Sequence, residues 1–142
     1  MRRPHPRWRA EGRTMITADQ LVLHFVGDYL LQSGWMATQK SKKVYVAAVH
    51  ALVYALPFLL LRPSMAAFAF IVVTHTAMDR LRLARYLVWA KNWLGPYRPL
   101  SWSECRETGY PPSQPAWMNV WLLIIVDNTL HVIMNGFALA YL

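Results

Sequence analysis

The chain has 142 residues, of which 56% are hydrophobic and only 15% are charged. This length fits one domain, and the composition is more apolar and less charged than that of ordinary soluble domains. The net charge of +8 does not indicate nucleic-acid binding, because the cations flank apolar segments and form no basic stripe interleaved with aromatic residues. Cys105 is the only cysteine, so an intrachain disulfide and a thiolate zinc cluster are excluded, and we expect a free thiol.

Four apolar segments predict helices that cross a membrane. They cover residues 16–35, 44–61, 65–83 and 116–142. Each is close to the ~20 residues with which a helix crosses ~30 Å of hydrocarbon. None shows the period-two alternation of a membrane β-strand. We therefore predict an all-α fold, a four-helix transmembrane bundle.

The third and fourth segments are separated by a proline-rich stretch, residues 85–115, which we predict to be a long cytoplasmic loop. Its prolines argue against a continuous helix. The first part, residues 86–94, mixes aromatic and basic side chains and is expected to lie along the membrane surface. The prolines are Pro96, Pro99, Pro111, Pro112 and Pro115.

Positive charge sets the predicted orientation. Lysines follow the first segment and arginines follow the third, whereas Arg62 is the only cation on the opposite side of residues 15–142. The positive-inside rule then makes both charged loops cytoplasmic, in a multi-pass protein of the bacterial inner membrane. Residues 1–14 add five arginines to the outer side. We expect a basic extension from a misassigned start, with Met15 opening a single membrane domain over residues 15–142. The alternative is a cytoplasmic tail that inverts the topology or makes the first segment re-entrant.

Acidic residues within the apolar segments tend to stand four positions from a histidine. Four positions are about one helical turn, so each such pair shares a helix face. Measured from the charged helix ends, these pairs and a lone histidine of the second segment fall in one layer of the cytoplasmic half. Charged groups inside membrane helices usually mark function. The residues are His24 with Asp28, His75 with Asp79, Asp127 with His131, and His50.

Imidazole and carboxylate groups together are ligands for first-row metals, and Zn, Mn and Fe are not distinguished by this set. We predict a divalent metal ion bound by the seven residues just named. A metal that lowers the pKa of a bound water to ~7 would support hydrolysis of a phosphoester or acyl bond. The predicted function is thus a metal-dependent hydrolase with the lipid bilayer and a lipid-like substrate as partners. No catalytic residue is assigned, and homo-oligomerisation stays open.

Two alternatives compete with the hydrolase. The same side chains would hold the bundle together in a non-enzymatic scaffold or phage–host interaction protein. Interhelical hydrogen bonds in membranes average about 0.6 kcal/mol, whereas one Asp at mid-bilayer costs about 2.5–3.5 kcal/mol, which argues against a purely structural use. A proton or cation path is the second alternative, and it would need further polar groups through the outer half.

Several short motifs resemble one family. Residues 24–32, HFVGDYLLQ, are followed by Trp35, Met36 and Lys40. This stretch is similar to the opening signature of a small integral-membrane family of unknown function in bacteria and tailed bacteriophages. The later histidine, H-x-x-x-D and D-N-x-x-H motifs agree, with Asn128 where the family usually has Gln. The resemblance covers about residues 15–131, implies a four-helix membrane protein with the His/Asp set as its site, and conveys no activity. A looser similarity, in His/Asp usage only, is to bacterial membrane-bound metal-dependent hydrolases.

Overall fold

The computed structural model describes residues 14–95 and 100–142, and all the regular secondary structure in these ranges is helical. The predicted all-α class is therefore confirmed. The predicted extension over residues 1–14 lies outside the described residues, apart from Thr14. The elements in chain order are α1 (Ala18–Phe25), the π-helical η1 (Val26–Leu30), α2 (Gly34–Gln39), α3 (Val44–Ala55), the 3₁₀-helical η2 (Leu56–Leu61), α4 (Met65–Leu81), α5 (Leu83–Lys91), the 3₁₀-helical η3 (Asn92–Leu94), α6 (Trp102–Cys105) and α7 (Ala116–Tyr141).

Local sequence signals explain several helix ends. Thr17 opens α1 with a capping box, in which its hydroxyl accepts from the Gln20 backbone N–H and the Gln20 side chain accepts in return. Ser64 caps α4 by accepting from a backbone N–H of its first turn. Arg62 and Arg82 have positive φ angles of 50° and 52°. These left-handed residues end the η2 and α4 helices and reverse or redirect the chain.

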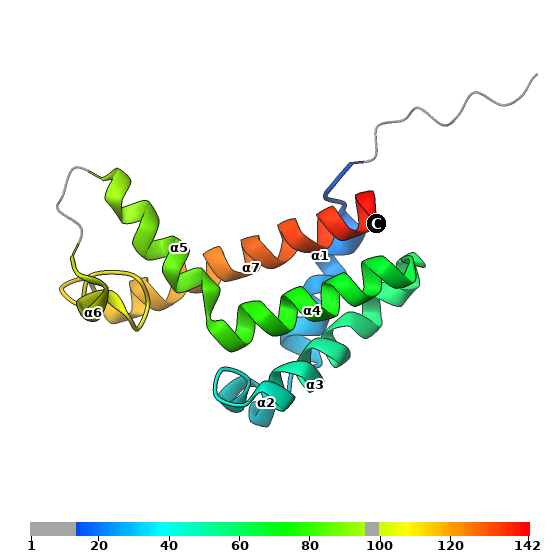
Figure 1. The fold of residues 1–142 in the computed structure, drawn as a ribbon, viewed down its shortest axis with the longest axis horizontal. Coiled ribbons are helices and arrows are strands. Elements are labelled where there is room, and N and C mark those ends of the chain that lie inside the picture. Colours follow the sequence, from blue (N-terminus) through cyan, green and yellow to red (C-terminus); the bar gives the residue numbers. More distant parts are fainter. Residues whose placement is uncertain (1–13, 96–99) are drawn as a thin grey trace, which may run out of the picture.

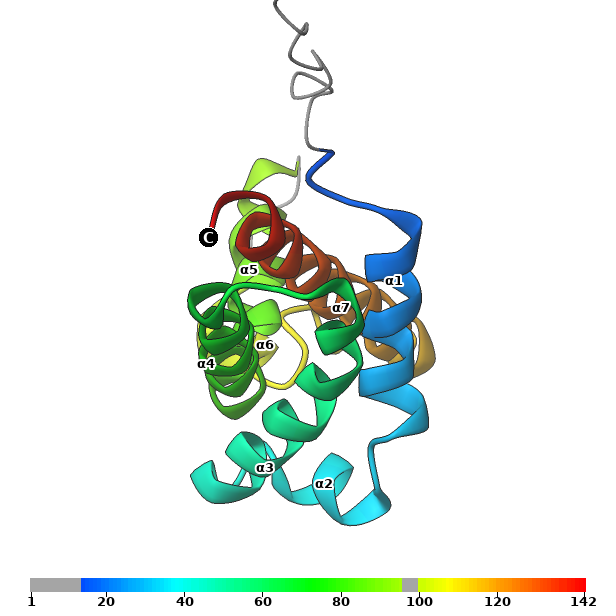
Figure 2. The same ribbon diagram turned by 90° about the vertical axis from the view of Figure 1, so that its right-hand side faces the viewer.

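Four helical segments lie side by side: α1–η1, α3–η2, α4 and the C-terminal part of α7 (Figures 1 and 2). The α4 helix packs between α3 and α7, and α1 contacts both α7 and η2. The N-terminal part of α7 extends beyond this group and packs against α5 (Figure 1). The short α2 lies beside the start of α3. In this arrangement the inner sides of the four segments face one another.

The first predicted segment is too long at its C-terminal end. The helix ends at Leu30, and Ser33 caps a separate helix, α2, by accepting from the Met36 N–H. The 13 residues from Ala18 to Leu30 span only about 20 Å at 1.5 Å per residue, less than a bilayer core. Hydropathy alone does not show that a serine within an apolar stretch begins a new helix.

The predicted loop over residues 85–115 is also wrong in its first part, which is helical as α5 (Leu83–Lys91) and η3. The left-handed Arg82 separates α4 from α5, and α5 itself contains no proline. The first prolines of this stretch lie within residues 96–99, which are outside the described ranges. Aromatic rings connect α5 with α6, since Tyr86 stacks on Trp102 with ring centroids 4.5 Å apart.

The interior combines a hydrophobic core around Tyr54, Phe58 and Ile71 with a buried polar cluster. Within residues 14–95 and 100–142, two helical segments, Val44–Leu61 and Ala116–Tyr141, are long and apolar enough to cross a membrane, with mean hydropathies of 2.1 and 1.6. Large apolar side chains are exposed on several helices, for example Leu60 at 78% and Val73 at 66%. In contrast, nine polar or charged residues are buried. They are Gln20, His24, Asp28, His50, His75, Asp79, Asn119, His131 and Asn135.

Candidate metal centre

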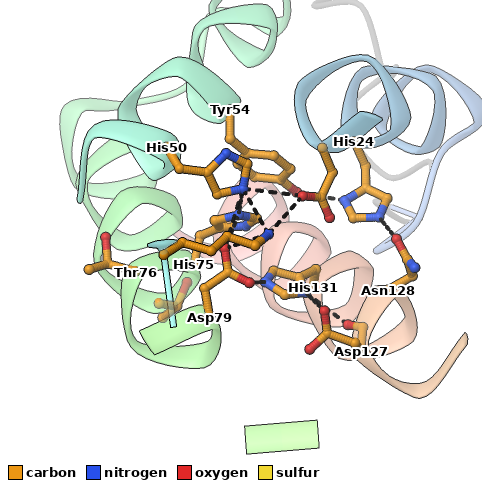
Figure 3. A network of polar contacts seen from close by, with 12 residues as sticks. His24, His50, Tyr54, His75, Thr76, Asp79, Asp127, Asn128 and His131 are labelled. Carbon is orange, nitrogen blue, oxygen red and sulfur yellow. Dashed lines mark hydrogen bonds and ion pairs between the residues drawn. The ribbon is translucent and has the colours of Figure 1, made fainter. Parts of the chain in front are cut away.

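Buried histidines and aspartates from four segments meet in the middle of the helix group (Figure 3). Their potential ligand atoms form two triads, each with all atoms within 4.8 Å of one another. The first triad consists of Asp28 from η1, His50 from α3 and His75 from α4. The second consists of His75 and Asp79 from α4 and His131 from α7. Five of the seven residues singled out by sequence are thus brought together, with His75 shared by the two triads.

The spacing of the inner atoms suits tetrahedral coordination. The Nε2 atom of His50 lies 3.0 Å from His75 Nε2 and 3.3 Å from Asp79 Oδ2. It also lies 3.2 Å from Asp28 Oδ1, and His75 Nε2 lies 3.1 Å from Asp79 Oδ2. Ligand atoms bound to zinc at 2.0–2.1 Å in a tetrahedron are about 3.3 Å apart. These four distances are therefore close to those between the ligand atoms of a tetrahedral zinc ion.

His131 is held in the form that binds metals. Its Nδ1 lies 2.8 Å from the backbone carbonyl oxygen of Asp127, which only accepts, so Nδ1 carries the proton and donates. In the neutral imidazole the lone pair is then on Nε2, which is buried, has no hydrogen-bond partner in the described part of the chain, and lies 3.9 Å from Asp79 Oδ1. A neutral imidazole whose other nitrogen donates to a carbonyl is the usual metal-ligating arrangement.

Asp79 also keeps unused acceptor capacity. Its Oδ2 atom is buried, and none of its close neighbours meets hydrogen-bond geometry, although Lys40, His50 and His75 nitrogens lie 3.0–3.3 Å away. Buried polar atoms are nearly always satisfied in proteins, and exceptions need an explanation. The Lys40 ammonium is the cation beside Oδ2, whereas the other carboxylate oxygen of Asp79, Oδ1, faces His131 Nε2.

Lys40 supplies a positive charge to this cluster. Its Nζ atom lies 3.0 Å from Asp79 Oδ2, 3.2 Å from His50 Nε2 and 3.5 Å from Asp28 Oδ1. Burial alone lowers the pKa of this ammonium, but the carboxylates of Asp79 and Asp28 outweigh burial and raise it above the ordinary lysine value. Lys40 is therefore charged at neutral pH and occupies part of the space where a metal ion would bind.

Sequence reasoning took Lys40 for a topology signal only. After η1 the chain turns at the Ser33 cap and continues as α2. Lys40, twelve residues beyond Asp28, is thereby brought next to the Asp28 carboxylate. Its position within the family-like opening stretch was the available signal. Hydropathy and helical periodicity do not report such a return of the chain.

His24 contributes no free nitrogen to the triads. Its Nδ1 lies 2.7 Å from the Tyr54 hydroxyl and its Nε2 lies 2.7 Å from Asn128 Oδ1. Because Asn128 Oδ1 accepts, His24 donates through Nε2, and the Tyr54 hydroxyl donates to Nδ1. Both ring nitrogens are thereby used, and the predicted role of His24 as a ligand is not supported by this geometry.

Asp127 also lies outside the two triads. Its Oδ2 is 3.7 Å from His131 Nδ1, and its side chain is 30% exposed. It faces an open cavity rather than the buried ligand atoms. Its backbone carbonyl orients His131, while its carboxylate adds negative charge beside the cluster.

Tyr54 and Asn135 are buried residues of the site that the sequence analysis did not single out. The Asn135 side-chain amide donates to the Tyr54 hydroxyl at 2.5 Å. The Tyr54 ring stacks on His75 with ring centroids 3.7 Å apart and an interplanar angle of 21°. Tyr54 therefore fixes the orientation of His75 and, through its hydroxyl, that of His24. The only sequence signal was that Asn135 lies one turn beyond His131.

An open cavity of about 360 Å³ lies against the cluster. Asp28, Lys40, Asp79 and Asp127 are among its lining residues, so it connects the buried ligand atoms with the outside. Metal sites that keep access from one side are typical of catalytic rather than purely structural sites. The site thus has potential metal ligands, an open cavity through which a substrate can reach them, and neighbouring groups that orient the histidines.

The fold and the cluster define an all-helical protein with buried His/Asp groups whose spacing suits a metal ion. The chain belongs to the family described as "Protein of unknown function (DUF3307)", whose model matches residues 16–138. The predicted membership in an uncharacterised family is therefore confirmed, while the family's phage distribution and its individual motifs remain predictions. Comparison with curated proteins and with solved structures gave no match.

Proposed function

We propose that this is a multi-pass protein of the bacterial inner membrane with four crossing segments. The exposed large apolar side chains and the buried polar cluster support this, because lipid cannot satisfy polar groups and they must face one another. The α4 helix has 17 residues and spans about 26 Å. The shorter α1–η1 segment would cross with local thinning of the bilayer or with its capped ends at the interface. The basic loops around Lys40 and Arg82 would face the cytoplasm.

We propose that the cluster binds a divalent metal ion. The single observation that carries this proposal is the pair of buried triads that share His75, with ligand atoms within 4.8 Å. Two triads with one shared imidazole suit either one ion with an orienting carboxylate or two neighbouring ions. Zn, Mn and Fe all accept this mixture of nitrogen and oxygen donors.

The chemistry that this site supports best is hydrolysis of a membrane-delivered ester. The metal ion would act as a Lewis acid that makes water nucleophilic near neutral pH. In a phosphoester, the water oxygen forms a bond to phosphorus as the bond from phosphorus to the leaving oxygen breaks. The water loses a proton and the leaving alcohol gains one. Asp127 is placed to exchange that proton, since its carboxylate lines the cavity.

A non-enzymatic scaffold is the competing function, and Lys40 is the observation in its favour. Its ammonium already neutralises part of the charge of Asp28 and Asp79 without a metal ion. On this view the cluster fixes helix register, and replacing a ligand lowers stability without removing a metal. Metal binding and stability must therefore be measured on the same variants.

The proposed function is tested by titrating chelator-treated protein in detergent with Zn²⁺ and Mn²⁺ and following the unfolding midpoint. Binding to the folded state alone raises stability by about 2.7 kcal/mol at a hundred times the Kd. We expect a concentration-dependent rise in wild type that is lost in His75→Gln. A control variant, Thr76→Ser, alters the next residue and should keep the rise. No rise in wild type with either ion would contradict the metal site.

A further inference from the structure

An apolar groove lies next to the cavity beside the His/Asp cluster. We propose that the two together bind a single-chain amphiphile whose head group is a phosphate. The cavity would hold the head and the groove the hydrocarbon chain. This inference rests on the proposed function for the part played by the metal ion, which would lie between the head group and the carboxylates.

The cavity offers cations to an anionic head. Lys40, Arg82 and Arg85 all line it. One guanidinium nitrogen of Arg82 donates to the Glu107 carbonyl at 2.7 Å, and Arg85 Nη1 donates to the Arg106 carbonyl at 3.0 Å. These backbone contacts hold both side chains in place. Arginine recognises phosphate through several N–H donors at once.

Arg85 keeps a donor in reserve. Its Nε atom is buried and has no acceptor in the described ranges. A phosphate oxygen would become its acceptor once the Arg85 side chain turned this nitrogen toward the cavity that the residue lines, and a buried guanidinium donor without a partner favours that change. The carboxylates of Asp28, Asp79 and Asp127 on the same cavity would repel a phosphate. A divalent cation between them would turn this repulsion into a bridge.

The groove between α1 and α7 suits a hydrocarbon chain. It has a volume of about 420 Å³ and is lined almost entirely by apolar side chains. It shares Tyr29, Ile124 and Asn128 with the charged cavity, so the two lie next to each other. The Asn128 amide donates to the Tyr29 hydroxyl at 2.7 Å, which marks the boundary between the polar and apolar parts. The remaining lining includes Ile16, Leu21 and Phe25 from α1 and Trp121, Ile125 and Ile133 from α7.

The geometry also favours an amphiphile over a free anion. A groove facing lipid is reached from within the membrane, so the hydrocarbon chain of an amphiphile stays in apolar surroundings while its head group enters the charged cavity. A phosphate alone would gain the arginines but none of this apolar contact. The groove and the cavity together hold one head group and one hydrocarbon chain in this proposal.

The test uses an alkyl phosphate that carries a photoreactive diazirine at the end of its chain. Wild-type protein is reconstituted in phosphatidylcholine nanodiscs, irradiated, and the labelled residues are mapped by mass spectrometry. We expect labelling of the groove-facing residues of α1 and α7. The Arg82→Gln/Arg85→Gln variant should lose about tenfold in labelling, as expected for charge-assisted hydrogen bonds, whereas Lys42→Gln, an exposed lysine outside the cavity, should not.

A second pair of variants tests the chain independently of the arginines. Thr129→Trp should fill the groove and abolish labelling there, whereas Val73→Trp, on an exposed position of α4 outside the groove, should leave it unchanged. The neutral alkyl alcohol with the same diazirine should label all lipid-facing helices alike. If the phosphate and the alcohol give the same labelling pattern, or if the arginine variant labels like wild type, the inference is overturned.

Two further arms separate the sources of the signal. In one arm, inorganic phosphate competes with the alkyl phosphate for the protein. If inorganic phosphate displaces the alkyl phosphate completely and the alkyl phosphate labels all helix faces alike, the site binds free phosphate, and the proposal of an amphiphile is overturned. Metal content is measured on the same samples. Arginine-dependent groove labelling in protein that takes up no metal would uphold this inference and contradict the metal centre. Bound metal without such labelling would do the reverse.

Discussion

Replacing Lys40 with methionine should tighten metal binding. The Lys40 ammonium lies within 3.5 Å of Asp28 and Asp79 oxygens and of the His50 Nε2 nitrogen, so it competes with a metal ion for the same electron pairs. A bound ion must either displace this ammonium or tolerate its repulsion. Methionine keeps most of the length of the side chain and removes the charge.

The magnitude follows from the contacts. Two unit charges about 4 Å apart attract by about 4 kcal/mol at an effective dielectric constant of 20. Rotation of Lys40 into the open cavity, which it also lines, recovers part of this energy for the metal-bound protein. We therefore expect Lys40→Met to lower the Kd for Zn²⁺ by about ten- to a hundredfold, or about 1.4 to 2.7 kcal/mol.

The assay is competition for Zn²⁺ against a chromophoric chelator in detergent at pH 7. The metal-free variant should also unfold at a lower temperature than wild type, because two buried carboxylates lose their cation. Lys42→Met, two residues away and exposed, is the matched control and should change neither quantity. An unchanged or weakened Zn²⁺ affinity in Lys40→Met would refute the view that the ammonium and the ion share one position.

Three further variants address the cluster and its support. Asp79→Asn should weaken Zn²⁺ binding at least tenfold in the same assay, because its oxygens face the other ligands, whereas Asp127→Asn should stay within about threefold; equal losses would contradict the assignment of inner ligands. Tyr54→Phe should lower the free energy of unfolding by about 1–3 kcal/mol, because the two buried partners of the hydroxyl, His24 and Asn135, are left unpaired. The Zn²⁺ affinity of this variant is measured as well, to separate a loss of stability from a loss of metal binding. Gly27→Ala should destabilise by about 1–3 kcal/mol, since a Cβ there would lie 2.6 Å from the Tyr54 carbonyl oxygen, while Gly34→Ala, with nothing within 4 Å, should not; equal thermal midpoints for the two would show that α1–η1 and α3 do not approach so closely.

The helical class was predictable because apolar segments of suitable length leave few other solutions. The second segment, residues 44–61, was predicted with the bounds that the structure has. The first was not, because Ser33 starts a new helix within an apolar stretch. Local capping chemistry overrides hydropathy there. The helical α5 was missed because the prolines that follow it were taken to act over the whole segment.

The convergence of the site was predictable from spacing and depth, since i, i+4 pairs share a face and polar faces must turn inward. The roles within the site were not. His24 and His131 have equivalent sequence patterns, yet Asn128 and Tyr54 occupy both nitrogens of His24, whereas a carbonyl leaves one nitrogen of His131 free. Such differences depend on partners from other helices. Lys40 was missed for the same reason.

Elemental analysis of the purified protein tests the central claim most directly. The protein is extracted in mild detergent without chelators, passed over a desalting column, and its Zn, Mn and Fe contents are measured per chain. The buried triads predict one or two equivalents of a divalent metal in wild type, and less than about a tenth of that in His75→Gln. Wild-type protein without stoichiometric metal, after expression in medium supplemented with these ions, would contradict the account.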